Sequence, residues 1–144
     1  MMRVLLDTNV LLDALLQRAP WHVEADAILQ AATRGEVIGA VTPISLANMF
    51  YVGRRIVGTE RARREVRTSL AVFEILATNR ETLLQADVLP GPDFEDNIQI
   101  AAAVAAGVDA IVTRDPADFS ASPVTVLTPA QLLALLAAET SPGG

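Results

Sequence analysis

The stretch Val4-Leu5-Leu6-Asp7-Thr8-Asn9 begins with apolar side chains and ends with three polar ones. Residues 3–6 predict a short buried strand, and Thr8 or Asn9 is expected to cap the helix that follows. Asp7 then lies at the carboxyl end of a strand, where open α/β sheets bind their ligands in a crevice. The stretch therefore predicts an α/β fold with a carboxylate in that crevice.

Strands and helices alternate along the rest of the chain. Further strands are expected at residues 37–41, 74–77, 109–113 and 124–127. Helices are expected at about residues 21–34, from 43 to the break at 58, and at 60–73, 79–88, 94–106 and 129–139. Because such alternation forms a parallel sheet covered on both faces, we predict one α/β domain. Its mostly parallel sheet should have four to five strands, within residues 1–139, and residues 140–144 should form a frayed tail.

The composition fits one well-filled domain. The chain has 144 residues, of which 51% are hydrophobic and 19% are charged. A mean hydropathy of +0.37 indicates that a partner or a second copy covers some apolar surface. No secretory signal is evident, and the apolar run at residues 100–108 is too short to span a membrane, so we expect a cytoplasmic protein.

The charged residues exclude several chemistries. A net charge of −6 argues against a nucleic-acid footprint spread over the whole surface. The chain has no Cys, which excludes disulfides, thiolate metal sites and Cys nucleophiles. It also has no Lys, which phosphate-loop proteins, haloacid-dehalogenase-type phosphatases and response-regulator receivers all use. The single histidine, His22, lies far along the chain from the acidic clusters, which disfavours a histidine general base.

Two further acidic clusters follow or begin regular elements. Asp93, Glu95 and Asp96 crowd the start of an expected helix, and Asp115 and Asp118 follow an expected strand. Several carboxylates in one crevice repel each other unless a hard cation neutralises them, and oxygen ligands suit Mg²⁺ or Mn²⁺. The three clusters together predict a divalent-metal phosphodiester hydrolase.

Each cluster also has a purely structural interpretation. Asp7 is a favourable helix cap, and Asp96 fits a solvated acidic first turn. Asp115 and Asp118 flank Pro116, and both residue types favour turns. Of these two, Asp115 is the better candidate for the crevice because it lies closer to the end of the strand.

Arginines concentrate between residues 54 and 67, where only Glu60 and Glu65 offset them. Contacts with nucleic-acid phosphates are one interpretation of this cluster, since phosphate binding requires grouped basic side chains. The other is a solvated helix face or a surface for an acidic protein. The candidate nucleic-acid-binding residues are Arg54, Arg55, Arg61 and Arg64.

In their order and spacing these motifs resemble the PIN domain family, which includes the VapC-type toxin ribonucleases. Residues 5–9, residues 93–96 with 100–103 behind them, and residues 111–115 with 118–119 carry the resemblance. It implies a compact α/β nuclease in which acidic residues hold Mg²⁺ or Mn²⁺ and water is activated to attack an RNA phosphodiester. The matching catalytic and metal-binding positions are Asp7, Asp96 and Asp115, with Asp118 as a further metal ligand. The matching supporting positions are Thr8, Asn9, Asn48, Glu95 and Thr113.

The second acidic position of the family is where this sequence departs from the pattern. Asn48 stands where most members carry Glu, and no Asp or Glu occurs between Glu36 and Glu60. An amide supplies a carbonyl oxygen but no charge, so metal binding should be weaker. Asn48 followed by Tyr51 is similar to a subgroup of PIN domains that carries Asn with a nearby Tyr.

Two functions are consistent with these residues. The resemblance implies a metal-dependent endoribonuclease, the toxin of a toxin–antitoxin pair, which binds RNA and a small antitoxin and forms a homodimer. The alternative is a noncatalytic PIN-like module that binds RNA or a protein, and Asn48 is its main support. Retained carboxylate clusters would cost such a module stability without benefit, which favours the nuclease.

Overall fold

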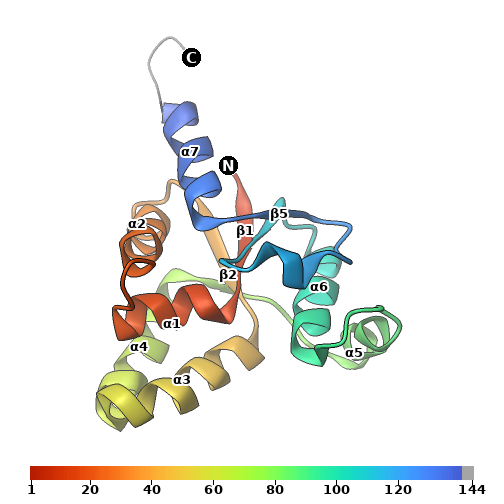
Figure 1. The fold of residues 1–144 in the computed structure, drawn as a ribbon, viewed down its shortest axis with the longest axis horizontal. Helices are drawn as coiled ribbons and strands as arrows, with labels where there is room; N and C mark the ends of the chain where they lie inside the picture. Colours follow the sequence, from red (N-terminus) through yellow and green to blue (C-terminus); the bar gives the residue numbers. More distant parts are fainter. Residues whose placement is uncertain (141–144) are drawn as a thin grey trace.

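A five-stranded sheet forms the centre of the molecule (Figure 1), whose computed structural model describes residues 1–140. The strand order is β3-β2-β1-β4-β5, and all neighbouring strands are parallel. The strands are β1 (Arg3–Leu6), β2 (Ile38–Val41), β3 (Glu74–Ile75), β4 (Ala110–Val112) and β5 (Thr125–Leu127). The expected α/β fold with helices on both faces of a parallel sheet is confirmed.

The helices begin and end close to where the sequence predicts them. They are α1 (Thr8–Leu16), α2 (His22–Thr33), α3 (Pro43–Val57), α4 (Thr59–Val72), α5 (Arg80–Asp87), α6 (Phe94–Ala106) and α7 (Pro129–Thr140), with a short 3-10 helix η1 (Pro116–Phe119). Residues 116–119 thus form a helical turn after β4, where we expected a simple turn. The tail predicted for residues 140–144 lies outside the described residues from residue 141 onward.

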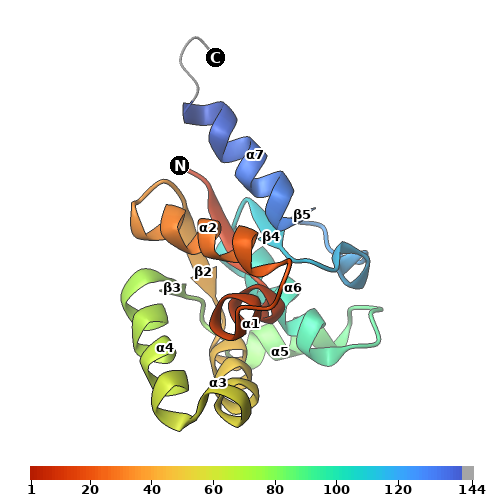
Figure 2. The same ribbon diagram turned by 60° about the vertical axis from the view of Figure 1, so that its left-hand side comes forward.

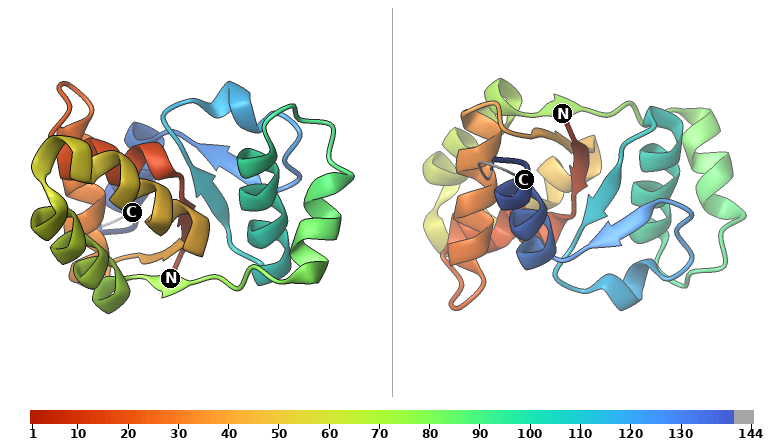
Figure 3. Two further views of the ribbon diagram at one scale, coloured as in Figure 1. Left: turned by 90° about the horizontal axis from the view of Figure 1, so that it is seen from below. Right: turned by 90° about the horizontal axis from the view of Figure 1, so that it is seen from above.

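Alternate side chains of β1 point to opposite faces of the sheet. Val4 and Leu6 pack in the core beneath α1, α2 and α7, whereas Leu5 packs with Ile100 of α6 and with Phe119 on the other face. All five are fully buried or nearly so, and each large apolar side chain contributes about 1.5–3 kcal/mol. Figures 2 and 3 show α1 to α4 gathered on one side of the sheet and α5 and α6 on the other.

Helices α1 and α3 approach closely because of one glycine. A Cβ atom on Gly53 would lie 2.5 Å from Cδ2 of Leu15. The missing side chain therefore lets the last turns of α3 pack closely onto α1. Among the described residues, every helix is too short or too polar to span a bilayer.

The order of the strands places a crevice beside β1. From β1 the chain moves outward to β2 and β3, and it then returns to β4 on the opposite side of β1. In open α/β sheets, ligands bind outside the carboxyl ends of the strands at such a switch point. Asp7 follows β1 and Asp115 follows β4, so both lie at this end of the sheet.

Candidate active site

Asp7 is fixed at the junction of β1 and α1. Its backbone N–H donates to the carbonyl of Val112 at 3.0 Å, which extends the β1–β4 pairing by one residue. One carboxylate oxygen accepts from the Thr8 N–H at 2.8 Å, and the other accepts from the Thr113 hydroxyl at 2.8 Å. Asp7, rather than Thr8 or Asn9, is the cap of α1, because its backbone is extended at φ −69 and ψ 154 while Thr8 is already helical.

Burial perturbs the ionisation of Asp7. The side chain is almost excluded from solvent, and this desolvation is the main cause that raises its pKa from 3.8 to about 6. Hydrogen bonds from Thr113 and Thr8 oppose the rise, while the charges of Glu95 and Asp115 add to it. Asp7 therefore caps a helix, as its structural interpretation requires, and it also carries a carboxyl group with a raised pKa.

Asp96 lies in the first turn of α6, half-buried. Asp93 caps this helix and accepts from the Asp96 N–H at 3.0 Å. Desolvation is the largest cause that raises the pKa of Asp96 to about 7, followed by the charges of Asp93, Asp7, Asp118 and Glu95. The carboxylates that raise the pKa of Asp96 therefore come from α6, from the end of β1 and from η1. The structure thus brings the three acidic clusters of the sequence close together.

Asp115 and Asp118, which follow β4, are both exposed. The Asn9 amide donates to the carboxylate of Asp115 at 3.1 Å. The hydroxyl oxygen of Thr113 accepts from the Asp115 N–H at 3.1 Å while its proton is donated to Asp7. Thr113 therefore sets the distance between the first and last acidic clusters.

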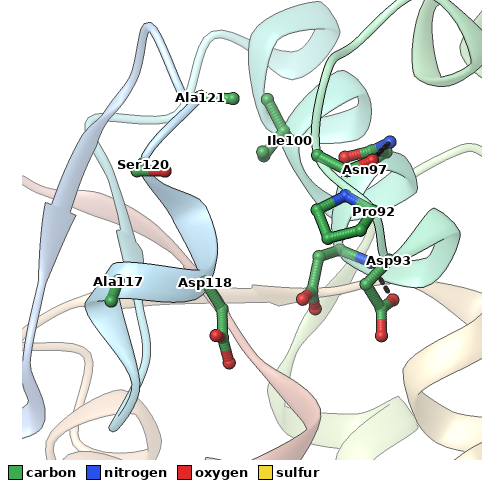
Figure 4. A pocket seen from close by; sticks show the side chains of 10 residues that line it. Pro92, Asp93, Asn97, Ile100, Ala117, Asp118, Ser120 and Ala121 are labelled. Carbon is green, nitrogen blue, oxygen red and sulfur yellow. Dashed lines mark hydrogen bonds between the residues drawn. The ribbon is translucent and has the colours of Figure 1, made fainter.

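A cavity of about 260 Å³ opens between α6 and η1. Three carboxylates line it, those of Asp93, Asp96 and Asp118, together with Asn97 and Ile100. In Figure 4, Asp118 on η1 faces Asp93 across this space. The cavity is therefore an acidic pocket at the carboxyl end of the sheet.

A network of buried polar side chains holds the residues around the acidic cluster in place. The Thr8 hydroxyl lies 2.8 Å from the Ser45 hydroxyl and donates to Glu95 at 3.1 Å. Gln99, which has no exposed surface, accepts from the Thr42 hydroxyl at 2.9 Å and donates to Ser45. The network joins the starts of α1 and α3 to the first turns of α6. Sequence reasoning missed Thr42, Ser45 and Gln99, although a glutamine among the small apolar residues of α6 is a signal that could have found them.

Asn48 lies on α3 one turn after Ser45 and is half-buried. Within residues 1–140 its side chain makes no hydrogen bond, and its predicted supporting role stays a prediction. The carbonyl oxygen of Asn9, by contrast, is buried and lacks a hydrogen-bond partner among the described residues. Asn9 therefore offers one neutral amide oxygen in addition to the carboxylates.

The four predicted RNA-binding arginines lie on the exposed surface of α3 and α4. The Arg54 guanidinium stacks on the Tyr51 ring, with its central carbon 5.0 Å from the ring centroid, and Arg63 lies 5.5 Å from the centroid of Phe50. Among the described residues, none of these arginines pairs with a carboxylate of the acidic cluster. The basic surface and the acidic pocket are therefore separate features.

The donor set fits a hard divalent cation by its chemistry. It consists of oxygen atoms alone, and no arginine of the described chain lowers the raised pKa of Asp7 or of Asp96. No group of three or more Asp, Glu or His side chains within residues 1–140 is yet arranged so that it could hold a metal ion. Like charges repel, which is consistent with carboxylates that face a common space without touching.

Comparisons with known proteins agree with this architecture. The structure is similar to VapC20 from Mycobacterium tuberculosis, a sarcin-ricin loop cleaving toxin, with a TM-score of 0.69, 16% identity, and coverage of 85% of this chain and 96% of that one. It is similar to a toxin–antitoxin complex from Klebsiella pneumoniae, with a TM-score of 0.67, 23% identity and coverage of 88% and 97%. It is also similar to VapBC2 from Rickettsia felis bound to promoter DNA, with a TM-score of 0.67, 17% identity and coverage of 88% and 98%. At these identities the likeness shows the fold alone.

The search of curated proteins gave no match. The family comparison, in contrast, matches the PIN domain over residues 3–117, which include the ends of β1 and β4 and the start of α6. A carboxylate at each of these three points, on a five-stranded parallel sheet, is what the resemblance of the sequence implied. The chain belongs to the PIN domain family.

Proposed function

We propose that this protein is a divalent-metal-dependent endoribonuclease, the toxin of a toxin–antitoxin pair. The observation that carries the proposal is that carboxylates from the end of β1, the first turn of α6 and η1 gather at one end of the sheet. Burial and the nearby charges there raise the pKa of Asp7 to about 6 and that of Asp96 to about 7. Neighbouring carboxylates contribute to both shifts, and no arginine offsets either. Groups held in this way at considerable electrostatic cost are characteristic of functional sites.

The cation would be Mg²⁺ or Mn²⁺, held by Asp7, Asp96 and Asp115 with Asp118 as a further ligand. When bound, it would neutralise the carboxylates, activate water and stabilise charge on the phosphate. The protein's own contribution is to orient the ligands. Thr113 and Thr8 fix both oxygens of Asp7.

The remaining partners are proposed from the family and from the surface. Solved structures of similar fold include toxin–antitoxin complexes and a toxin that cleaves the sarcin-ricin loop. We therefore propose RNA as the substrate, a small antitoxin as a partner, a homodimer and a cytoplasmic location. Arg54, Arg55, Arg61 and Arg64 would hold the RNA backbone, since they lie on one exposed helical hairpin and are free of the acidic cluster.

Asn48 favours a second candidate, a noncatalytic module that binds RNA or a protein. It supplies no charge at the position where most family members carry Glu. The two candidates differ in one property, because only the nuclease needs a cation at the acidic cluster.

The deciding experiment is Mn²⁺ titration calorimetry of the wild type and of Asp96→Asn, followed by an RNA cleavage assay. We expect the wild type to bind Mn²⁺ and the variant to lose at least tenfold in affinity, because a charged ligand is removed. Asp87→Asn is the matched control, since Asp87 is exposed at the end of α5, away from the cluster. Wild-type protein that neither binds Mn²⁺ nor cleaves RNA would reject the nuclease in favour of the noncatalytic module.

A further inference from the structure

A second cavity, of about 240 Å³, lies beside the acidic cluster on the side of α1 and α2. Its polar and aromatic lining comes from α1, from the residues at the start of α2, from the loop after β4 and from the loop before α7. These residues are Asp13, Trp21, Glu24, Arg114 and Thr128. None of them belongs to the metal ligands proposed above.

Trp21 and Arg114 form a stacked pair in this cavity, which we call the platform. The guanidinium carbon of Arg114 lies 4.0 Å from the centroid of the Trp21 ring, and Trp21 remains 44% exposed. Arg114 Nε also lies 3.3 Å from a carboxylate oxygen of Asp13, whose side chain is only 3% exposed. Arg18 pairs with the other oxygen of Asp13 at 3.1 Å. The buried carboxylate thus fixes the guanidinium against the ring.

The platform lies next to the acidic cluster, because Arg114 and Asp115 are neighbours in the loop after β4. Arg114 stands directly between Thr113, which binds Asp7, and Asp115. Asp115 accepts from the Asn9 amide at 3.1 Å on the side of the cluster, while its neighbour in the chain, Arg114, pairs with Asp13 on the side of the cavity. A strand of RNA held at the cluster would therefore pass within reach of the second cavity.

One acidic side chain in the lining of this cavity is available to accept a hydrogen bond. Glu24 is half-buried in the first turn of α2 and makes no hydrogen bond or ion pair within residues 1–140. A second phosphate is a poor ligand here, because Arg114 is already paired with Asp13 and the carboxylate of Glu24, which has no cationic partner among the described residues, would repel it. A neutral, flat group with N–H donors on its rim suits the lining better.

We propose that this cavity binds one nucleobase of single-stranded RNA, next to the phosphodiester at the acidic cluster. The base lies against Trp21 and Arg114, and its exocyclic amino group donates to Glu24. Aromatic rings and guanidinium planes are the usual stacking surfaces for unpaired bases, and carboxylates accept from the amino group of cytosine. This inference rests on the proposed function, since it assumes RNA at the cluster.

The test compares two labelled single-stranded RNAs of equal length, one of cytidines and one of uridines, by fluorescence anisotropy without added metal. The two bases differ at the position where cytosine carries an amino group and uracil an oxygen. Wild-type protein should bind the cytidine RNA more tightly. Trp21→Ala should weaken binding by about 5- to 150-fold, Trp21→Phe should retain most of the affinity, and Glu24→Gln should remove the preference for cytidine.

Leu135→Ala is the matched control, because Leu135 on α7 is also 44% exposed. Trp21 is the only tryptophan, so quenching of its emission by the cytidine RNA reports on this cavity directly. Trp21→Ala that binds both RNAs within twofold of the wild type would overturn the proposal, as would wild-type protein that binds neither. Retained preference in Glu24→Gln would overturn the role of Glu24.

The outcomes that reject the base site differ from those that reject the proposed nuclease function. RNA cleavage together with unchanged binding by Trp21→Ala would reject the base site alone. Weakened binding by Trp21→Ala in a protein that does not bind Mn²⁺ would support the base site and reject the nuclease.

Discussion

The Thr113 hydroxyl donates to the Asp7 carboxylate across 2.8 Å, and this bond joins the carboxyl ends of β1 and β4. The two residues are 106 positions apart in the chain, so the contact forms only when the centre of the sheet has assembled. The bond lowers the pKa of Asp7 against the opposing effect of burial. Thr113 is therefore a support for the charged form of the first acidic residue.

Replacement of Thr113 by Val should test this support. The variant keeps the shape of the side chain but leaves a buried carboxylate oxygen without its donor, which costs about 1–3 kcal/mol of unfolding free energy. Mn²⁺ affinity should fall about tenfold, because the pKa of Asp7 rises further. Urea unfolding and calorimetry measure the two effects. Thr33→Val, on the exposed face of α2, is the control, and equal losses in both variants would contradict the assignment.

The stability of the metal-free protein should decrease as the pH rises. The folded-state pKa values of about 6 for Asp7 and about 7 for Asp96 lie above the ordinary value of 3.8, so the folded chain holds these protons more tightly than the unfolded chain. The two carboxyl groups therefore lower the free energy of unfolding by nothing below pH about 4 and by their full amount above pH about 7. Urea unfolding across this range should show the decline.

Asp96→Asn isolates the share of Asp96 in that decline. Above pH about 7, without metal, the variant should be more stable than the wild type by about 1–3 kcal/mol, a range that allows for solvent screening of a half-buried group. Added Mn²⁺ should stabilise the wild type far more than the variant. Parallel stability curves for the two proteins would show that Asp96 does not carry the electrostatic cost assigned to it.

Asn48→Glu should strengthen the proposed metal site. The substitution restores the charge that most family members have at this position, so Mn²⁺ binding should tighten about tenfold and any RNA cleavage should accelerate. Without metal, the added charge should lower the melting temperature. Ala47→Glu places the same charge on the adjacent, exposed position of α3 and should change neither property. Unchanged Mn²⁺ affinity in Asn48→Glu would show that residue 48 does not face the cation.

Gly53→Ala should destabilise the packing of α3 on α1. The added methyl group would lie 2.5 Å from Cδ2 of Leu15, so this buried side chain would have to shift. Such overpacking costs about 1–3 kcal/mol, of which the better helix propensity of Ala offsets about 1 kcal/mol. Leu15→Ala in the same chain removes the obstructing atom, so the double variant should lose less stability than the sum of the two single changes. Strict additivity in urea unfolding would contradict a direct contact.

The strands and most helix ends were predictable because their signals are local. A continuous apolar run from Val4 to Leu6 placed β1, and a threonine followed by proline placed the start of α3. Asp7, Asp96 and Asp115 were likewise identified from their positions after or at the start of elements. The fold and the acidic positions thus depend mainly on neighbours in sequence.

What the sequence did not predict depends on distant contacts. The network of Thr42, Ser45 and Gln99 forms only where α3 meets α6. The stacking of Arg114 on Trp21 likewise joins two residues that are far apart in the sequence. The choice of Asp7 over Thr8 as the cap of α1 follows from the β1–β4 pairing, which holds the Asp7 backbone extended. Each of these features requires the sheet before it can exist.

The dependence of the acidic cluster on β4 also has a consequence during synthesis. Asp7 is translated before Thr113, which follows it by 106 positions, and before Asp115. A nascent chain therefore carries an incomplete cluster until β4 has emerged and entered the sheet beside β1. If the cluster cleaves RNA, the ribosome that makes the protein is exposed to that activity only after β4 has folded.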